Sequence, residues 1–194
     1  ALGADDANLP AKERARRERA RESGGGIVAY DATRDLTVAA FAIGAQVARV
    51  DLETGNIDML PTADGAFDPR LSPDGSSVAY VADNALRLAD HAGDRLVIEE
   101  DGDTVSWGAA EFIAGEEMGR TRGFWWAPDS LRLLVERVDV APIDEWWIAA
   151  PVDPSAAPTP IRYPGAGTAN AEVALAIVGL DGSRIDVDWH GGSS

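Results

Sequence analysis

Residues 71–81, LSPDGSSVAYV, carry a turn motif that recurs twice more in this 194-residue chain. A second copy is WAPDSLRLLV at 126–135, and a degenerate earlier copy is DATRDLTVAAF at 31–41. Proline fixes the first turn position, aspartate bonds to nearby backbone and glycine takes a positive φ, so the motif sets the register of a hairpin. A single copy would indicate an ordinary hairpin, whereas three spaced copies with similar flanks predict repeated antiparallel sheets.

Short apolar segments separated by turn residues surround these motifs, as is typical of strands. The expected strands form three sets and the start of a fourth: 27–30, 36–43, 46–52 and 56–60; 67–72, 77–82, 85–90 and 95–99; 123–126, 131–138, 146–149 and 160–163; then 172–179 and 184–189. Four strands per repeat predict an all-β fold, a partial β-propeller of about three and a half four-stranded antiparallel blades. The open edges of such an array favour a homo-oligomer.

The chain is strongly acidic, with a formal net charge of -16 from 33 acidic and 17 basic residues. Its basic residues concentrate at 11–22, where glutamates three or four positions from arginines predict an exposed helix. We therefore expect an N-terminal helical arm at 1–23 and a propeller portion at 24–194. The acidic body argues against nucleic acid or an anionic membrane as a partner.

Several functional classes have no support in the sequence. There is no cysteine, and the two histidines, His91 and His190, are far apart, so neither a metal nor another cofactor is expected. The apolar runs are too short to span a bilayer, and no secretory signal pattern opens the chain. These features favour a soluble, cytoplasmic protein.

A short helical insert is expected near 110–120, directly ahead of an aromatic strand. Adjacent carboxylates on it, Glu116 and Glu117, would form a receptor for a cation if packed structure holds them; the alternative is a solvated helix end in an acidic chain. Trp125 and Trp126 are expected in the core or in a cavity wall. Arg120 and Arg122 are candidate counter-ions for the two acids, or else surface charges.

Residues 110–129, followed by 162–173 (RYPGAGTANAEV), resemble the N-terminal propeller of the dipeptidyl peptidase IV branch of the prolyl oligopeptidase family of serine peptidases. Residues 17–27 (RERARESGGGI) are similar to the lead-in of bacterial members, and the resemblance covers about 11–190. The paired glutamates ahead of Trp125 are its most specific part, since Pro-Asp-Gly turns recur in other propellers such as those like TolB. The resemblance implies that Glu116 and Glu117 bind the free α-ammonium of a peptide substrate. Arg120, Arg122, Trp125 and Trp126, which lie close by in the sequence, are candidates for supporting residues.

In that family a C-terminal α/β-hydrolase domain performs the chemistry, with its nucleophile on a Gly-x-Ser-x-Gly elbow. No such elbow occurs in these 194 residues, so no catalytic residue is assigned and the chain alone is predicted to be inactive. The resemblance implies a serine-type dipeptidyl peptidase as the parent protein, with a peptide N-terminus and the hydrolase domain as partners. The alternative function is a non-catalytic, TolB-like propeller that binds a protein. The family's additional substrate-binding arginine has no assigned position.

Overall fold

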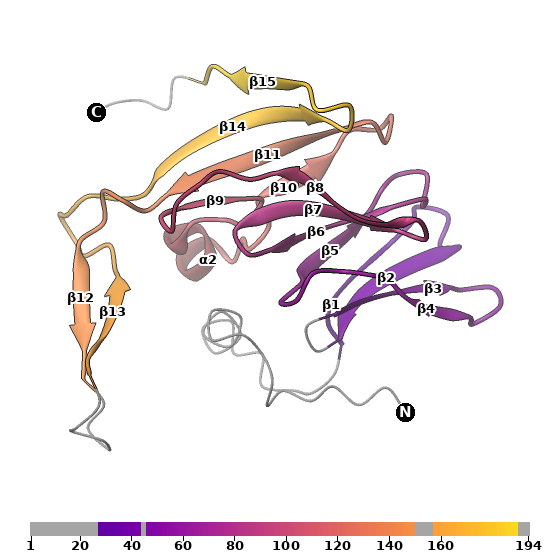
Figure 1. The fold of residues 1–194 in the computed structure, drawn as a ribbon, viewed down its shortest axis with the longest axis horizontal. Coiled ribbons are helices and arrows are strands. Elements are labelled where there is room, and N and C mark those ends of the chain that lie inside the picture. The colour runs from indigo at the N-terminus through magenta and orange to yellow at the C-terminus, as the bar shows by residue number, and fades with distance from the viewer. Residues whose placement is uncertain (1–26, 44–45, 150–156, 190–194) are drawn as a thin grey trace.

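The computed structural model describes residues 27–43, 46–149 and 157–189, whose regular secondary structure consists almost entirely of antiparallel β-strands (Figure 1). The helical arm expected at 1–23 lies outside these residues. One helix, α2 (Phe112–Met118), occurs among them and coincides with the insert expected near 110–120. The all-β class with a short helical insert is therefore confirmed.

The first half of the described chain forms two four-stranded sheets in which each strand pairs with the next. Sheet one contains β1 (Ile27–Ala32), β2 (Val38–Ile43), β3 (Gln46–Asp51) and β4 (Ile57–Met59); sheet two contains β5 (Phe67–Leu71), β6 (Val78–Ala82), β7 (Ala85–Asp90) and β8 (Gly93–Ile98). Both sheets match the first two expected sets. Local turns explain the agreement: Asp83 and Asn84, between β6 and β7, have φ of 49° and 67°, which is the geometry of a two-residue type I′ hairpin.

The third sheet is assembled differently from the expectation. It contains β9 (Val105–Trp107), β10 (Phe124–Trp126), β11 (Arg132–Asp139), β14 (Glu172–Gly179) and β15 (Arg184–Val187). Strand β11 pairs with β14 along its whole length, from Arg132 opposite Gly179 to Asp139 opposite Glu172. The segment 172–179 therefore belongs to the third sheet, and not to the start of a fourth.

Two strands that were expected to complete that sheet instead form a separate hairpin. These are β12 (Glu145–Ile148) and β13 (Thr159–Arg162), which pair with each other and stand apart from the three sheets in Figure 1. The reason lies in the side chains: all four residues of β12 are exposed, whereas β11 and β14 share a buried apolar face. The expected grouping of strands was wrong here, because apolar content alone does not reveal which segments pair.

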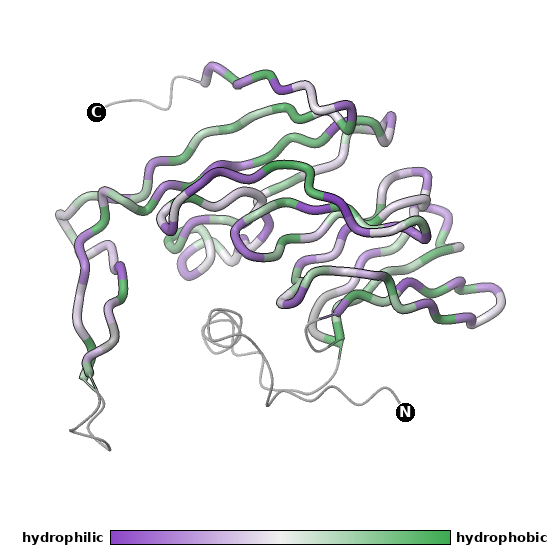
Figure 2. Tube along the Cα trace, viewed as in Figure 1, coloured by the Kyte–Doolittle hydropathy of each residue, from purple (hydrophilic) through white to green (hydrophobic). Residues whose placement is uncertain are grey.

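Sheet two lies between the other two sheets, and its strand β6 shows how. All five residues of β6 are buried, and they alternate between two clusters. Ala79 and Val81 face a core shared with sheet three, whereas Val78, Tyr80 and Ala82 face a core shared with sheet one. In Figure 2 hydrophobic residues follow the strands and hydrophilic ones gather at the turns. A strand buried on both faces is expected to be continuously apolar, as Val78–Ala82 is.

The three copies of the turn motif have the same backbone geometry. In each copy the backbone amide of the first turn residue donates to the carbonyl of the residue five positions on, and its carbonyl accepts from the amide of the residue three positions on. The residues involved are Ser72 with Ser77 and Gly75, Thr33 with Val38 and Leu36, and Ala127 with Arg132 and Ser130. The fourth turn position has a φ of 71° at Gly75 and 58° at both Leu36 and Ser130. The copies also touch, since the Asp74 amide donates to the Ser130 hydroxyl oxygen at 3.1 Å.

Candidate functional site

The insert, residues 108–123, interrupts an edge strand of sheet three. Strands β9 and β10 both pair with β11, on either side of one residue, Glu136. The Gly108 amide donates to the Glu136 carbonyl at 2.9 Å, and the Glu136 amide donates to the Gly123 carbonyl at 2.7 Å. The Gly123 amide closes the loop on the Gly108 carbonyl at 3.0 Å. The chain thus leaves and rejoins the sheet at a single point opposite Glu136.

Two glycines make this crossing point sterically feasible. A Cβ on Gly123 would lie 2.7 Å from the carbonyl carbons of Gly108 and Ala109, which are backbone atoms that cannot move aside. Gly108 has a φ of 86°, a conformation that L-residues with side chains rarely adopt. The base of the insert therefore depends on glycine at both positions. Neither glycine was predicted from the sequence to have this role, and β9 was not predicted.

Helix α2 forms the tip of the insert, and both of its ends are capped. The Glu111 carboxylate accepts hydrogen bonds from the amides of Ile113 and Ala114, each at 2.6 Å, which is N-terminal capping. Gly119 follows the helix in the left-handed conformation, with a φ of 62°, and the Arg120 amide donates to the Ala114 carbonyl. These contacts explain how a seven-residue helix is defined without a long amphipathic face.

Tyr163, just after β13, makes a further contact with this helix. The rings of Phe112 and Tyr163 meet edge to face, with centroids 5.3 Å apart and planes at 71°. Such aromatic pairs are stabilising beyond the area that they bury. The insert is therefore held from its first helical residue as well as from its base.

Glu116 and Glu117 lie in the last turn of α2, and both are exposed. Neither side chain makes a hydrogen bond or ion pair with another residue that the structure describes. Carboxylates at this end of a helix are close to the unpaired backbone carbonyls, which carry partial negative charge. This placement does not favour helix stability. It creates a strongly negative, accessible surface suited to a cation.

Arg120 lies next to this pair in sequence, but its guanidinium is directed elsewhere. Its Nη1 and Nη2 atoms bond to the two carboxylate oxygens of Glu136, and Nη1 also donates to the Arg122 carbonyl at 2.9 Å. The bond to Glu136 raises the pKa of the Arg120 guanidinium above its ordinary value. Arg120 is therefore the counter-ion of Glu136. Arg122 is half-buried, and its backbone carbonyl accepts the hydrogen bond from Arg120.

The two tryptophans after the insert are half-buried and occupy different surroundings. Trp126 packs against the core between sheets two and three, and its Nε1 donates to the Arg70 carbonyl at 3.1 Å. Trp125 lines an open hollow of about 280 Å³ on sheet three, together with Arg120, Leu134, Glu136, Val173, Leu175 and Trp189. The insert and this hollow therefore share the Arg120–Glu136 pair.

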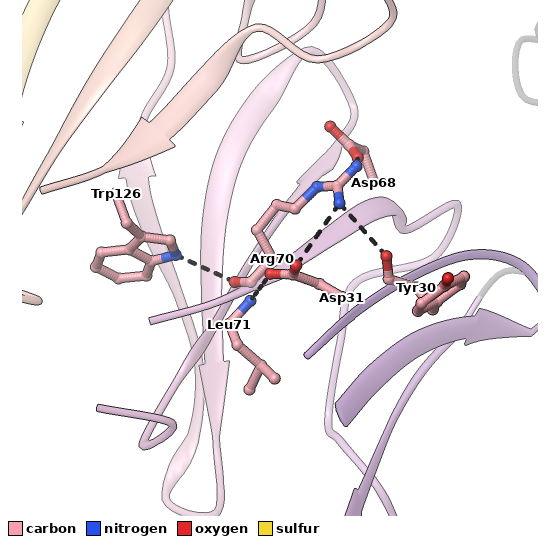
Figure 3. A network of polar contacts seen from close by, with 6 residues as sticks. All are labelled: Tyr30, Asp31, Asp68, Arg70, Leu71 and Trp126. Atoms are coloured by element: carbon pink, nitrogen blue, oxygen red, sulfur yellow. Dashed lines mark hydrogen bonds and ion pairs between the residues drawn. The ribbon is translucent and has the colours of Figure 1, made fainter. Parts of the chain in front are cut away.

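A polar network joins one strand from each of the three sheets, β1, β5 and β10 (Figure 3). Arg70 of β5 pairs with Asp68 at 2.5 Å, lies 3.9 Å from Asp31 of β1, and donates to the Tyr30 carbonyl. The Asp31 carboxylate also accepts from the Leu71 amide at 3.0 Å. With the Trp126 bond to Arg70, these contacts connect β1, β5 and β10.

Sequence reasoning missed both Arg70 and Glu136. The sequence did contain one indication of Glu136, because it is an acidic residue within a largely apolar strand. In the structure it is 2% exposed. Its partner Arg120 lies 16 positions away, and no sequence spacing links the two.

The described residues contain no group of three or more metal-ligating side chains placed to hold an ion. Within the same ranges, no helix combines the length and apolar character that crossing a bilayer requires.

Comparison with solved structures places this architecture in the β-propeller class. The crystal structure of Porphyromonas gingivalis dipeptidyl peptidase 4 superimposes with a TM-score of 0.70 over 89% of this chain, at 24% sequence identity. The match takes in 27% of that protein. At this identity the likeness establishes the fold.

Sequence comparison gives the family. Residues 37–192 match the model of the dipeptidyl peptidase IV (DPP IV) N-terminal region, and the chain belongs to this family. Dipeptidyl peptidase 8 from Mus musculus is 28% identical over 146 residues, and that from Homo sapiens is 27% identical over 145 residues. These alignments cover 65% and 62% of this chain. In both cases the chain spans 16% of the relative's length.

Proposed function

We propose that Glu116 and Glu117 bind the free N-terminus of a peptide, and that this chain is the substrate-gating propeller portion of a dipeptidyl peptidase IV-like serine exopeptidase. One observation carries the proposal. Two adjacent carboxylates project, exposed and without described partners, from an insert anchored in the propeller of a chain that belongs to the DPP IV N-terminal family.

The chemistry suits an α-ammonium group. Carboxylates form charge-assisted hydrogen bonds with an ammonium, and two of them can occupy two of its three donors. The carbonyl end of α2 adds to the negative potential. An internal peptide segment has no cation at the matching position, so the pair selects chain ends over chain interiors.

Peptide hydrolysis itself requires a separate catalytic domain. The 194 residues hold no nucleophile elbow, and we assign the bond-breaking groups to an α/β-hydrolase domain of the parent protein. In this arrangement the insert binds the peptide's first residue and so determines which peptide bond lies at the nucleophile. The propeller then contributes substrate selection, and the hydrolase contributes the nucleophile.

Cleavage of dipeptidyl anilides by the full-length protein tests this function. Replacing Glu116 or Glu117 by Gln removes a charge and keeps the shape, and each change is expected to lower kcat/KM by about 100-fold, as for a lost charged contact. The matched control is Glu53→Gln, an exposed glutamate in the turn after β3, which should leave kcat/KM unchanged. Full activity of both insert variants would contradict the proposal.

The β12–β13 hairpin supports a second candidate function, a non-catalytic module that associates through exposed apolar surface. Trp146, Trp147 and Ile148 are 55%, 63% and 54% exposed. Three consecutive large apolar side chains are rarely so exposed. We propose self-association through this hairpin or through the open sheet edges. Sedimentation of the full-length protein should show a dimer or larger species that Trp146→Ser and Trp147→Ser weaken, and a monomer at all concentrations would exclude it.

A further inference from the structure

We propose that Glu136 is a positioning residue for the peptide receptor: through its buried ion pair with Arg120, it sets the location of Glu116 and Glu117. This inference rests on the proposed function of the two exposed glutamates. It assigns a role in that function to a residue of β11 that itself lies in the sheet and not on the insert.

Glu136 contacts the insert with both its backbone and its side chain. Its amide and carbonyl bond to Gly123 and Gly108, where the insert rejoins and leaves the sheet. Its carboxylate reaches across to Arg120, which lies beyond the helix on the returning segment. One sheet residue thus fixes the insert at its base and again near its tip.

Arg120 carries this restraint directly to the two carboxylates. It follows the helix-ending Gly119 and lies three positions after Glu117. Its amide donates to the carbonyl of Ala114, a buried residue of α2, so its backbone is part of the helix terminus. Moving Arg120 therefore requires moving the last turn of α2, where Glu116 and Glu117 are located.

Burial makes the restraint specific to one geometry. The Glu136 side chain is 3% exposed, and a buried carboxylate without its partner is strongly destabilised. Other positions of the insert would leave that charge unpaired. The pair therefore favours one position of the insert over other positions. This effect differs from a general stabilisation of sheet three.

A neighbouring pair on the same strand provides the matched control. Arg137 bonds to Glu100 at 2.6 Å through two nitrogens, as Arg120 does to Glu136, but the Glu100 side chain is 38% exposed, against 3% for Glu136, and neither partner belongs to the insert. Arg137→Gln therefore removes an arginine–glutamate pair from β11 without releasing α2.

Hydrogen exchange in the full-length protein tests the positioning role without any assumption about substrate. Glu136→Gln is expected to speed amide exchange in 112–118 by about tenfold or more, since local opening governs exchange, while β6 stays protected. Arg137→Gln should leave 112–118 unchanged. If Glu136→Gln fails to fold, Arg120→Gln, made at the more exposed partner, should give the same local result. Unchanged exchange in 112–118 for a folded variant overturns the proposal.

A second measurement asks whether positioning matters for the ammonium group. The readout is kcat/KM for a dipeptidyl anilide divided by that for its des-amino analogue, which lacks the cation. Glu136→Gln should reduce this ratio by about 10- to 100-fold through a higher KM for the amino substrate, because small displacements of a binding group are costly. The des-amino substrate should be unaffected.

The two measurements separate the two hypotheses. If Glu116→Gln and Glu117→Gln leave the ratio at its original value, the proposed ammonium receptor fails, whatever Glu136 does. If those variants abolish the preference for the amino substrate and Glu136→Gln leaves that preference intact, the ammonium receptor is supported and the positioning role is overturned. Because the partners act as a unit, Arg120→Gln combined with Glu136→Gln should lose no more than the larger single effect. Additive losses would contradict the mechanism.

Discussion

Gly123 occupies a point where two backbone segments lie too close together for any side chain, and this determines how the insert meets the sheet. Gly123→Ala would place a methyl group 2.7 Å from the carbonyl carbons of Gly108 and Ala109. We expect a loss of about 3 kcal/mol in the free energy of unfolding, as for other strained backbone positions. Urea denaturation of the full-length protein, followed at the transition that includes this domain, measures it.

The control for this prediction is another glycine of the same insert. Gly115 lies inside α2, and a Cβ there would meet nothing within 4 Å. Gly115→Ala should be neutral or stabilise by about 0.5–1 kcal/mol, because alanine favours the helix. Equal destabilisation by both alanines would show that the close approach at Gly123 does not limit stability.

At the scale of single residues, the sequence predicted the tip of the insert but not its support. Glu116 and Glu117 were expected on a short helix near 110–120, and they lie on α2. Glu136 and Gly108 were not identified, because their roles arise from strands that pair across the sheet. Arg120 was close enough in sequence to suggest a counter-ion for the glutamate pair, yet it bonds to Glu136 of strand β11.

Turns are the elements that the sequence specified best, and their aspartates predict an acid-sensitive stability. The pKa values of Asp35, Asp74 and Asp129 are below the ordinary 3.8, chiefly because the Thr33 and Ser72 hydroxyls and the Leu131 amide, respectively, donate to them. A carboxyl whose pKa is lower in the folded chain stabilises the fold above its unfolded pKa. That stability is lost as the pH falls through the folded pKa.

Replacing the three turn aspartates by asparagine should therefore flatten the acid limb of the stability curve. The triple variant should be less stable than the parent at pH 7 and should lose less stability on acidification below about pH 4. Urea midpoints at neutral and acidic pH measure the difference. Asp58→Asn, on the exposed strand β4, is the control and should reproduce the parent curve. Parallel curves for parent and triple variant would refute the assigned role of the turns.

The grouping of strands into sheets shows what short stretches of sequence do not predict. Sheets one and two follow chain order through tight turns, so the expected sets and the observed sheets agree. In sheet three, β11 pairs with β14 across the intervening β12–β13 hairpin, and β9 joins from before the insert. Long-range pairing of this kind depends on which apolar faces bury one another, and this is not encoded in the spacing of turns.

At the scale of the whole molecule, three sheets stack so that sheet two is buried on both faces, and the Arg70 network connects one strand from each sheet, β1, β5 and β10. This stacking gives the insert a fixed base within a propeller of the DPP IV N-terminal family. The chain spans 16% of the length of its dipeptidyl peptidase 8 relatives. The proposed division of labour assigns substrate selection to this part and hydrolysis to a separate domain.

A crystal structure of the full-length protein with a bound dipeptide that has a free N-terminus tests the proposed ammonium receptor directly. We expect the α-ammonium nitrogen to lie about 2.7–2.9 Å from carboxylate oxygens of both Glu116 and Glu117, the usual length of charge-assisted hydrogen bonds. We also expect Arg120 to remain paired with Glu136. A dipeptide whose ammonium contacts other residues, with both glutamates still facing solvent, would show that the pair is not the receptor.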